Sequence, residues 1–505
     1  MAPDHARDRG RDAETEAIRS SYRAVSYDSR PCASSTPARI ATIAGLMGIA
    51  APEPSTARVL EIACGNGGNL LPMAARTPRG RFTGIDLASD AIGVARAFAR
   101  ELGLANVELI DGDLRDLPAG TGTFDYIVAH GFYSWVPGDV RRALFDTIRA
   151  RLAPDGIAFV SHNVLPGCAL RGITWSLLRP HVAAIADPVA KVAEIRAMAG
   201  RVAEAMAAQP GIAAGLAQEF RDVADREAFA LMHDDFAPVN HPVFLRDIVA
   251  EAADHGLAWL ADADPYRHPA PAYGEAMNAW LAGAERIERE HVIDHLRMRR
   301  FRESLFVHDG RGLGGPLAPE RLASMHVAAT NTTVERHGSR PQAVADGDRS
   351  AQAVQRRLIA RLVACHPSSE PVAELARWIA EESGPDSALA APGQAKRLLL
   401  SACLMQVLVP YAWPVAIPRA AGDRPRAFAP ARWQAGRHPW VANLRHESVR
   451  IDDPVQRALL PLLDGTRTRA DLAGALSTLG AASLARAASL DEYLAHFARI
   501  GVIEA

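Results

Sequence analysis

The fold of this chain is decided by one stretch, Val59-Leu60-Glu61-Ile62-Ala63-Cys64-Gly65-Asn66-Gly67-Gly68-Asn69-Leu70. A short apolar run ends beside an acidic residue, glycines follow, and the next residues have helical spacing. This order is typical of a strand that turns tightly into a helix. The glycines let the backbone approach a ligand closely, and the start of the helix offers free N–H groups to it. The stretch therefore predicts a ligand-binding loop.

Strands and helices are expected to alternate on both sides of this loop. The apolar runs predict strands over residues 58–63, 82–85, 107–110, 125–129 and 156–161. Segments with helical periodicity predict helices over residues 13–25, 37–47, 69–75, 89–102 and 140–152. Strands that alternate with helices form βαβ units. We therefore expect an α/β fold in which a parallel sheet carries helices on both faces.

The composition changes after Gly167, where a long helical region begins. Residues 170–230 are rich in alanine, and their helical periodicity predicts one apolar side made of Val189, Val192, Ile195, Met198 and Val202. A further helix is expected over residues 244–255. The runs 257–260 and 304–307 are expected to form two antiparallel strands that close the sheet, with helices between them.

The last part of the chain is expected to contain two linkers that are rich in Gly and Pro, over residues 309–350 and 410–439. The first of them has weak strand character around residues 325–333. Residues 351–408 between them read as a helical block. The C-terminal segment predicts three short amphipathic helices over 455–463, from Thr468 and from Ser489, and a terminal strand at Val502-Ile503. This segment resembles a small winged-helix module.

Length and charge exclude several classes of protein. A chain of 505 residues is too long for one core, and about two to four domains are expected. The formal net charge of −2 gives no electrostatic footprint for binding nucleic acid or an anionic membrane. The N-terminus lacks the apolar core of a signal peptide, and no apolar run is long enough to cross a bilayer. We therefore expect a soluble, cytoplasmic protein without membrane insertion, for which nucleic acid is an unfavoured partner.

Cysteines and histidines give no sign of a metal. The five cysteines are scattered without a CxxC pair, which indicates a reducing compartment and no structural zinc. His233, His241 and His255 lie among acidic residues but lack compact ligand spacing. The sequence therefore predicts no metal.

Acidic residues after the next two strands make the ligand more specific. Asp86 ends the second strand, where a carboxylate accepts hydrogen bonds from ribose hydroxyls, although nicotinamide enzymes share this feature. Asp113 and Leu114 follow the third strand, and an acid before a Leu-Pro turn is typical of adenine recognition by methyltransferases. We therefore predict S-adenosylmethionine as the methyl donor and S-adenosylhomocysteine as the product. The expected cofactor-binding residues are Tyr27, Glu61, Ala63, Gly65, Gly67, Asp86, Leu87, Asp113, Leu114 and His130.

Polar and aromatic residues follow the fourth and fifth strands, at His130-Gly131-Phe132-Tyr133-Ser134-Trp135 and at Ser161-His162-Asn163. Ligands of open α/β sheets bind at the carboxyl ends of the strands, so these groups are expected to converge on one crevice. The expected catalytic residues are Tyr133, His130 and Asn163, and the expected substrate-binding residues are Phe132, Tyr133 and Trp135. The alternative for these residues is a purely structural role. His130 is then a hydrogen-bonded histidine of the core, and the aromatic residues are core residues.

With these residues in view, the chain resembles the class I methyltransferases that carry a methyltransferase regulatory domain, including the rickettsial-type protein-lysine methyltransferases of outer-membrane proteins. The resembling segments are 27–31, 36–42, 67–74, 130–137, 163–167, 233–236, 255–263, 294–302, 443–446 and 462–467. The resemblance implies methyl transfer and a Rossmann-like sheet with a large helical insertion and smaller C-terminal helical and winged-helix-like domains. The chain departs from the group at Ala63, where glycine is usual, and at Thr36, where histidine is frequent.

Four domains follow from this organisation. The expected boundaries are 1–168 for the S-adenosylmethionine-binding domain, 169–310 for the insertion and regulatory domain, 311–425 for a mostly helical middle domain and 426–505 for the winged-helix-like module. The expected activity is methylation of protein lysine side chains, and a homodimer is left open. Two alternatives remain: a small-molecule O- or N-methyltransferase, and a non-catalytic regulatory protein that binds the cofactor.

Overall fold

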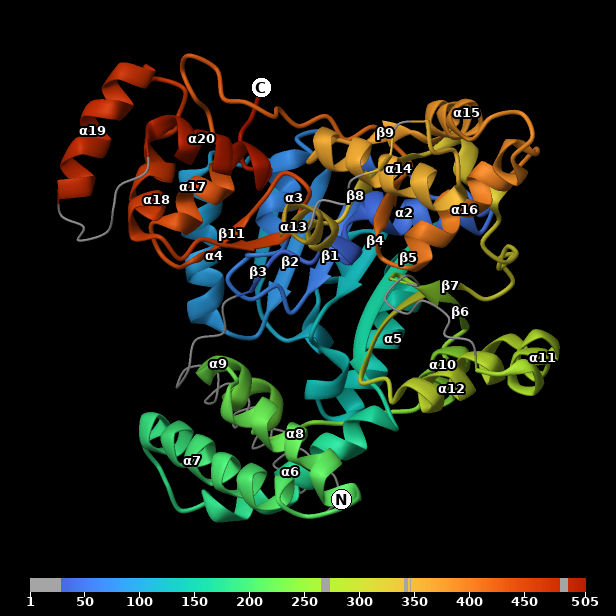
Figure 1. Cartoon of the computed structure of the whole chain (residues 1–505). Coiled ribbons are helices and arrows are strands. Elements are labelled where there is room, and N and C mark those ends of the chain that lie inside the picture. Colours follow the sequence, from blue (N-terminus) through green and yellow to red (C-terminus); the bar gives the residue numbers. More distant parts are fainter. Residues whose placement is uncertain (1–28, 265–272, 340–343, 346, 482–488) are drawn as a thin grey trace.

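The computed structural model describes residues 29–264, 273–339, 344–345, 347–481 and 489–505 (Figure 1). The helix expected over residues 13–25 and the cofactor residue Tyr27 lie outside the described residues. None of the helices in these described ranges combines the length and the hydrophobicity that crossing a membrane requires.

A seven-stranded sheet lies at the centre of the molecule, with strand order β3-β2-β1-β4-β5-β7-β6 (Figure 1). The first five strands are parallel, whereas β7 runs antiparallel to both β5 and β6. This confirms the expected fold class and the antiparallel pair that closes the sheet. The strands are β1 Arg58–Ile62, β2 Arg81–Asp86, β3 Val107–Asp111, β4 Phe124–Ala129, β5 Leu152–Asn163, β6 Leu257–Asp262 and β7 Phe301–His308.

Both faces of this sheet are covered, which explains why its central strands read as continuous apolar runs. Val59 and Val128 belong to the core on one face, and their neighbours Leu60 and Ile127 belong to the core on the other. This alternation follows from the two-residue period of side chains along a strand. The nearby helices are α2 Pro37–Leu46, α3 Leu70–Arg76, α4 Ser89–Glu101 and α5 Gly138–Arg151.

The helical insertion forms a small core of its own beyond the end of β5. In α7 the buried positions are Val192, Ile195, Ala199 and Ala203, which confirms part of the expected apolar side. Val189 is 78% exposed, so the expectation was wrong there. It lies in the first turn of α7, beyond the part that neighbouring helices cover. The elements are α6 Gly167–His181, α7 Pro188–Ala207, α8 Ile212–Ala224, α9 Ala228–Ala230 and η6 Leu231–Asp235.

The middle region has more regular structure than the two linkers and the helical block that the sequence predicts. The strand character expected around residues 325–333 is confirmed by β8, which is the central strand of the three-stranded sheet β10-β8-β9. The expected helix to residue 408 ends at Leu404, because Leu408–Tyr411 pairs with β8 instead. The elements are η8 Pro319–Ser324, β8 His326–Ala329, α13 Asn331–Ser339, α14 Ala351–Cys365, β9 Glu370–Pro371, α15 Val372–Ser383, η9 Ala388–Ala390, α16 Gln394–Leu404 and β10 Leu408–Tyr411.

The C-terminal module folds back onto the large sheet and lies beside α3 and α4 (Figure 1). The ring of Trp433 stacks on Phe98 of α4 with 3.9 Å between centroids. Ser489 and Glu492 form a capping box, as a helix start at Ser489 requires, whereas Ile503 makes a single bridge and no strand. The elements are α17 Ala429–Ala435, β11 Trp440–Ala442, β12 Ser448–Arg450, α18 Pro454–Leu459, η10 Leu460–Leu462, α19 Arg469–Ala481 and α20 Leu490–Arg499.

A buried cluster of charges fixes the strands that close the sheet. Arg302 of β7 is fully buried and its guanidinium donates to Asp262 of β6 at 3.2 Å and to Asp294 at 2.8 Å. Arg299 donates to the same Asp262 at 2.7 Å. Asp294 belongs to α12 Arg286–Arg297. Along the chain, α10 Leu245–Asp254 precedes β6, and α11 Glu275–Gly283 and α12 lie between β6 and β7. The cluster therefore joins a helix to both closing strands.

Replacing Arg302 by alanine is expected to lower the free energy of unfolding by about 3–5 kcal/mol, because Asp262 and Asp294 would stay buried with less compensating charge. Urea denaturation of the two proteins measures this loss. Arg201→Ala serves as the control, since Arg201 pairs with Glu194 at the surface and such pairs contribute about 0–1 kcal/mol. Equal stability losses in both variants would contradict the role given to the cluster.

Candidate functional site

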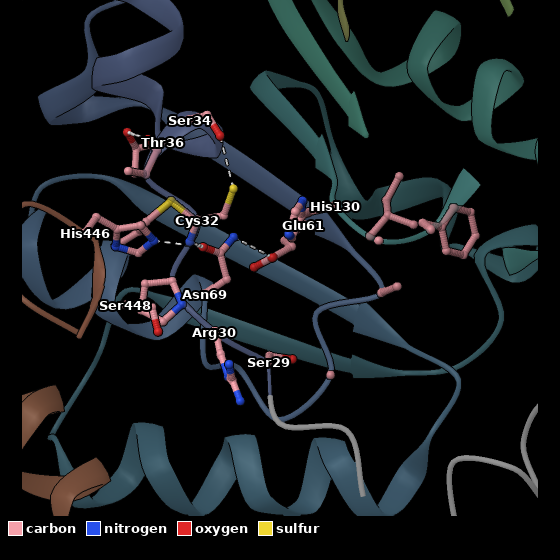
Figure 2. Close-up of a pocket in the computed structure, with 18 of the residues that line it drawn as sticks. Ser29, Arg30, Cys32, Ser34, Thr36, Glu61, Asn69, His130, His446 and Ser448 are labelled. Carbon is pink, nitrogen blue, oxygen red and sulfur yellow. Dashed lines mark hydrogen bonds between the residues drawn. The ribbon is translucent and has the colours of Figure 1, made fainter. Parts of the chain in front are cut away.

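A cavity of about 1600 Å³ lies at the carboxyl ends of the parallel strands (Figure 2). Its wall combines residues 29–42, the loops after β1 to β4, residues 226–234 of the insertion, residues 409–415 and residues 444–448 of the C-terminal module. Pockets for one small molecule usually measure about 300–1,000 Å³. This cavity therefore has room for more than one ligand.

Most of the residues predicted from the sequence line this cavity. The residues that do so are Glu61, Ala63, Gly65, Asp86, Leu87, Asp113, Leu114, His130, Phe132 and Trp135. They come from four different strand ends, which the parallel order of the sheet brings to one edge. These residues therefore lie around one cavity, whereas Ser161, His162 and Asn163 at the end of the fifth strand do not line it.

The carboxylate of Asp86 fastens two loops together at the end of β2. One oxygen accepts the Gly65 N–H at 2.8 Å, and the other accepts the Ala88 N–H at 2.8 Å. Burial raises the pKa of Asp86, and these two backbone N–H groups oppose that effect. Gly65 has a φ of +55°, and a Cβ there would lie 2.4 Å from the Ser29 hydroxyl oxygen. The loop after β1 therefore needs a glycine at this position.

Ala63 adopts a backbone conformation that favours glycine. Its φ is +58°, in the left-handed region. For a residue with a Cβ this conformation costs roughly 1–2 kcal/mol. Ala63 also lines the cavity, so its methyl group occupies space next to a bound ligand. The departure from glycine seen in the sequence thus has a definite structural cost.

The side-chain amide of Asn69 joins three distant parts of the chain (Figure 2). Asn69 is 2% exposed, and its Nδ2 donates to Glu61 at 2.8 Å and to the Ser35 hydroxyl at 3.1 Å. Its Oδ1 accepts the Cys32 N–H at 2.8 Å and the Nε2–H of His446 at 2.8 Å. One amide thereby holds the N-terminal segment, an acid of β1 and the C-terminal module.

His446 is neutral in this arrangement. Burial, helped by the charge of Arg76, lowers the pKa of His446 to about 3. Because Asn69 Nδ2 faces the acceptor Glu61, its Oδ1 faces His446, which must supply a proton on Nε2. The neighbouring Arg445 is also buried, with Nη2 3.1 Å from Glu447 and Nη1 donating to the Ala329 carbonyl at 3.1 Å. These contacts hold the segment that carries His446 against the cavity.

Arg30 provides a second junction at the rim of the cavity. Its guanidinium carbon lies 4.7 Å from the Phe229 ring centroid and 4.1 Å from that of Trp440, and its Nη2 is 3.1 Å from Glu227. Phe229 and Glu227 belong to the insertion, whereas Trp440 belongs to the C-terminal module. Cation–π contacts of this kind contribute about 0.5–2 kcal/mol each. The N-terminal segment thus fastens the insertion to the C-terminal module.

The acid predicted to recognise adenine already has a strong partner. Asp113 accepts the backbone N–H of Arg115 at 2.9 Å and starts the short helix η3 Leu114–Asp116. The Arg115 guanidinium lies 2.6 Å from the Asp113 carboxylate and 2.9 Å from that of Asp139. Both carboxylate oxygens of Asp113 therefore accept hydrogen bonds from Arg115.

Glu61 and His130 have pKa values shifted upward. Burial raises the pKa of Glu61 to about 7, although the hydrogen bond from Asn69 opposes the shift. Burial lowers the pKa of His130, but the surrounding Cys32, Glu303 and Glu61 raise it more, to about 9. His130 therefore carries a proton at neutral pH. In that state His130 donates a proton and does not accept one.

Three predicted residues do not line the cavity. Tyr133 is 1% exposed, and its hydroxyl donates to Glu251 at 2.5 Å. Asn163 donates to the Asn240 side chain at 3.1 Å, and Gly67 lies against Leu71. The reason at Tyr133 is local: the short helix η5 Tyr133–Trp135 directs successive side chains to different sides. Trp135 consequently faces the cavity while Tyr133 enters the core.

No sequence pattern predicts a role as site residues for Asn69, His446, Arg30, Cys32 or Glu303. Arg30, Asn69 and His446 lie within the segments that carry the family resemblance, but the spacing of the five residues along the chain gives no sign of a shared site. At Thr36, where related sequences frequently have histidine, the hydroxyl accepts the Arg39 N–H at 3.3 Å and caps α2. Thr36 therefore stabilises a helix that borders the cavity.

Three family models match successive parts of this chain. The model described as "Methyltransferase domain" matches residues 59–156, and the "Predicted methyltransferase regulatory domain" matches residues 227–308. The model described as "PKMT, C-terminal winged helix domain" matches residues 423–487. The match confirms the resemblance to a winged-helix module.

The chain is also similar to curated proteins of Rickettsia prowazekii (strain Madrid E). It is 31% identical to RP789 over 299 residues, which are 58% of this chain and 54% of that protein. It is 35% identical to RP028 over 162 residues, which are 31% of this chain and 65% of that protein. The chain therefore spans less than two thirds of the length of either relative.

Among solved structures, PKMT2 from Rickettsia typhi superimposes with a TM-score of 0.81 at 19% identity, over 94% of this chain and 99% of PKMT2. PKMT2 in complex with AdoHcy gives a TM-score of 0.80 at 20% identity, over 94% and 96% of the two chains. At this identity the likeness concerns the fold. The chain therefore has the fold of PKMT2 and contains segments that match a methyltransferase domain, a predicted methyltransferase regulatory domain and a PKMT C-terminal winged-helix domain.

Proposed function

We propose that this protein transfers a methyl group from S-adenosylmethionine to the side-chain amine of a protein lysine. The observation that carries the proposal is the Asp86 carboxylate, which fastens the glycine loop after β1 at the edge of a large cavity in a methyltransferase domain. PKMT2, which has the same fold, has been solved with AdoHcy, the demethylated donor. The length of the likeness, 94% of this chain, supports a shared type of activity.

The donor would lie along the edge formed by β1, β2 and β3. Asp86 is suited to the ribose hydroxyls, because a carboxylate at the end of the second strand accepts two hydrogen bonds. Asp113 and Leu114 would border the adenine, and the backbone of the loop at Gly65 would approach the methionine part. Tyr27 is a further proposed contact to the donor, on the basis of the sequence alone.

The chemistry asks for alignment more than for activation. The methyl group sits on a sulfonium, which is already a good leaving group, so the enzyme must place the amine in line with it and exclude water. Such alignment contributes up to about 7–11 kcal/mol in the best models. Residues 29–42 and 226–234 cover the cavity and would limit the access of water to the donor.

The acceptor would enter beside Phe132, Trp135 and His130, which line the cavity. An apolar surrounding favours the neutral amine over the ammonium, and only the neutral amine has the lone pair that attacks the methyl carbon. Aromatic faces also stabilise the cationic sulfonium and the methylated ammonium. Because Tyr133 and Asn163 lie outside the lining, we assign them a positioning role for the turn after β4 and the end of β5.

A small-molecule acceptor is the second candidate. It is favoured by the way in which the insertion and the C-terminal module wall the cavity, since a covered pocket suits a compact substrate. The non-catalytic alternative is supported by Ala63, which has a strained backbone conformation and lines the cavity. The absence of an Asn/Asp-Pro-Pro-aromatic motif and of basic enrichment leaves nucleic acid unfavoured as an acceptor.

Asp86→Ala is expected to weaken S-adenosylmethionine binding by at least about tenfold, since it removes the acceptor for Gly65 and for the ribose. Isothermal titration calorimetry on the full chain measures the two affinities. Asp111→Ala is the matched control, because Asp111 is the register partner of Asp86 on β3 but does not line the cavity. Equal affinity in wild type and Asp86→Ala would remove the assignment of the donor site.

His446→Ala is expected to weaken donor binding by roughly three- to tenfold, because Asn69 would lose one of its four partners and Glu61 would be less firmly held. His446→Gln keeps an N–H donor and is expected to restore most of the affinity. His496→Ala, in the same module but remote from the cavity lining, controls for general effects on the module. A loss of affinity that is the same for alanine and glutamine at position 446 would speak against this role.

Incubation with tritiated S-adenosylmethionine and a lysate of the source cell tests the acceptor class. The proposal expects label in a protein band, and acid hydrolysis is expected to release it as methyl-lysine. Label in the small-molecule fraction would support the second candidate instead. Donor binding without any transfer of label would favour the non-catalytic alternative.

A further inference from the structure

Three side chains with metal-ligating atoms meet at the wall of the cavity. The donor atoms of Cys32, His130 and Glu303 all lie within 4.8 Å of one another, and the Cys32 Sγ is 3.7 Å from Glu303 Oε1. Figure 2 shows Cys32 and His130 on the same part of the wall. In the described part of the chain, no other set of three or more His, Cys, Asp or Glu donors is as compact.

The three residues lie in separate parts of the fold, on β7, directly after β4 and in the N-terminal segment. Glu303 is 2% exposed and stands on β7, opposite Ser161 of β5. His130 directly follows β4, and the backbone N–H of the next residue, Gly131, donates to the Ser161 hydroxyl at 2.8 Å. The backbone N–H of Cys32 donates to Asn69. Sites on rigid elements hold their geometry better than sites on free loops.

The geometry points to a binding site for a zinc-like divalent cation with Cys32, His130 and Glu303 as its protein ligands. Thiolate, imidazole and carboxylate are the three ligand types that Zn²⁺ takes in proteins, and binding of the metal would displace the proton that His130 otherwise carries. Calcium and magnesium are disfavoured, because both prefer six or more oxygen ligands or ordered waters to a sulfur. All three residues line the cavity, so a fourth coordination position would face it.

The distances fit this assignment after a small contraction. Zinc–ligand bonds of about 2.0–2.3 Å put neighbouring tetrahedral ligands roughly 3.3–3.8 Å apart. The sulfur–oxygen pair already meets this spacing at 3.7 Å. The widest pair, within 4.8 Å, has to close by about 1 Å, which a rotation of the Cys32 or His130 side chain supplies.

One further contact supports a bound cation. The Ser34 hydroxyl lies 3.2 Å from the Cys32 sulfur, where it is suited to support a thiolate ligand from outside the metal's own shell.

The test is direct binding of the metal alone to the full chain, with no methyl transfer involved, so its result is separate from that of the proposed function. Calorimetric titration with Zn²⁺ is expected to give one site per chain. Cys32→Ser and Glu303→Gln are each expected to weaken it by about 100-fold or more, since the loss of even an outer partner typically costs 10–100-fold. With Co²⁺ as the probe, an absorption band of thiolate-to-cobalt charge transfer is expected, and it should disappear in Cys32→Ser.

The chain offers a matched control in its other Cys–Glu pair. Cys365 donates to Glu370 at 3.0 Å, but these two residues belong to no compact group of three such donors in the described residues. Cys365→Ser and Glu370→Gln are therefore expected to bind Zn²⁺ as wild type does. Zinc affinity that is unchanged in Cys32→Ser, or zinc lost equally in the Cys365 variant, would overturn the assignment.

A measurement on the wild-type chain covers the case in which the variants fail to fold. Alkylation of each cysteine is followed by peptide mass spectrometry with and without Zn²⁺. The site predicts that Zn²⁺ protects Cys32 and leaves Cys365 reactive. Equal alkylation of Cys32 in both conditions would refute metal ligation by its thiolate.

Discussion

The amide of Asn69 is the contact on which the cavity depends. A side-chain amide offers two donors and one acceptor oxygen, and here each is used by a different part of the fold: Glu61 and Ser35 accept, while Cys32 and His446 donate. A buried polar network is stabilising only when every member is satisfied. Moving any one of these segments would leave the others with unpaired groups, so the N-terminal segment, the sheet and the C-terminal module take one joint arrangement.

This constraint explains why the C-terminal module is part of the site. The module packs on α4 through Trp433, brings His446 to Asn69 and lets Trp440 cover Arg30 at the rim. Residues 444–448 therefore form part of the cavity wall. A winged-helix fold alone suggests a surface for contacting another macromolecule, but in this chain one side of the module is occupied by the methyltransferase domain.

Charge is arranged unequally around the cavity. At the end of β2, Asp86 is fixed by two backbone N–H groups. At the end of β4, Cys32, Glu303 and Glu61 surround His130 and favour its positive form. The same groups that favour the protonated form of His130 also make this wall suited to cations. The two sides are thus chemically different although both are built at the edge of one sheet, and the difference comes from the segments laid over the strands.

The sequence by itself determined the sheet, the glycine loop and the acids at the strand ends. These features are local: a two-residue or helical period, a glycine with φ above zero at Gly65 and an acid after an apolar run all act over a few residues. Parallel order then brings Asp86, Asp113 and His130 to one edge. The direction of Tyr133 and the partnership of Asn69 with His446 were decided only by tertiary structure. Tyr133 depends on how one short helical turn is rotated, and His446 lies 377 positions after Asn69. Such contacts form because buried polar groups must find partners in the completed fold, a condition that leaves no periodic trace in the chain.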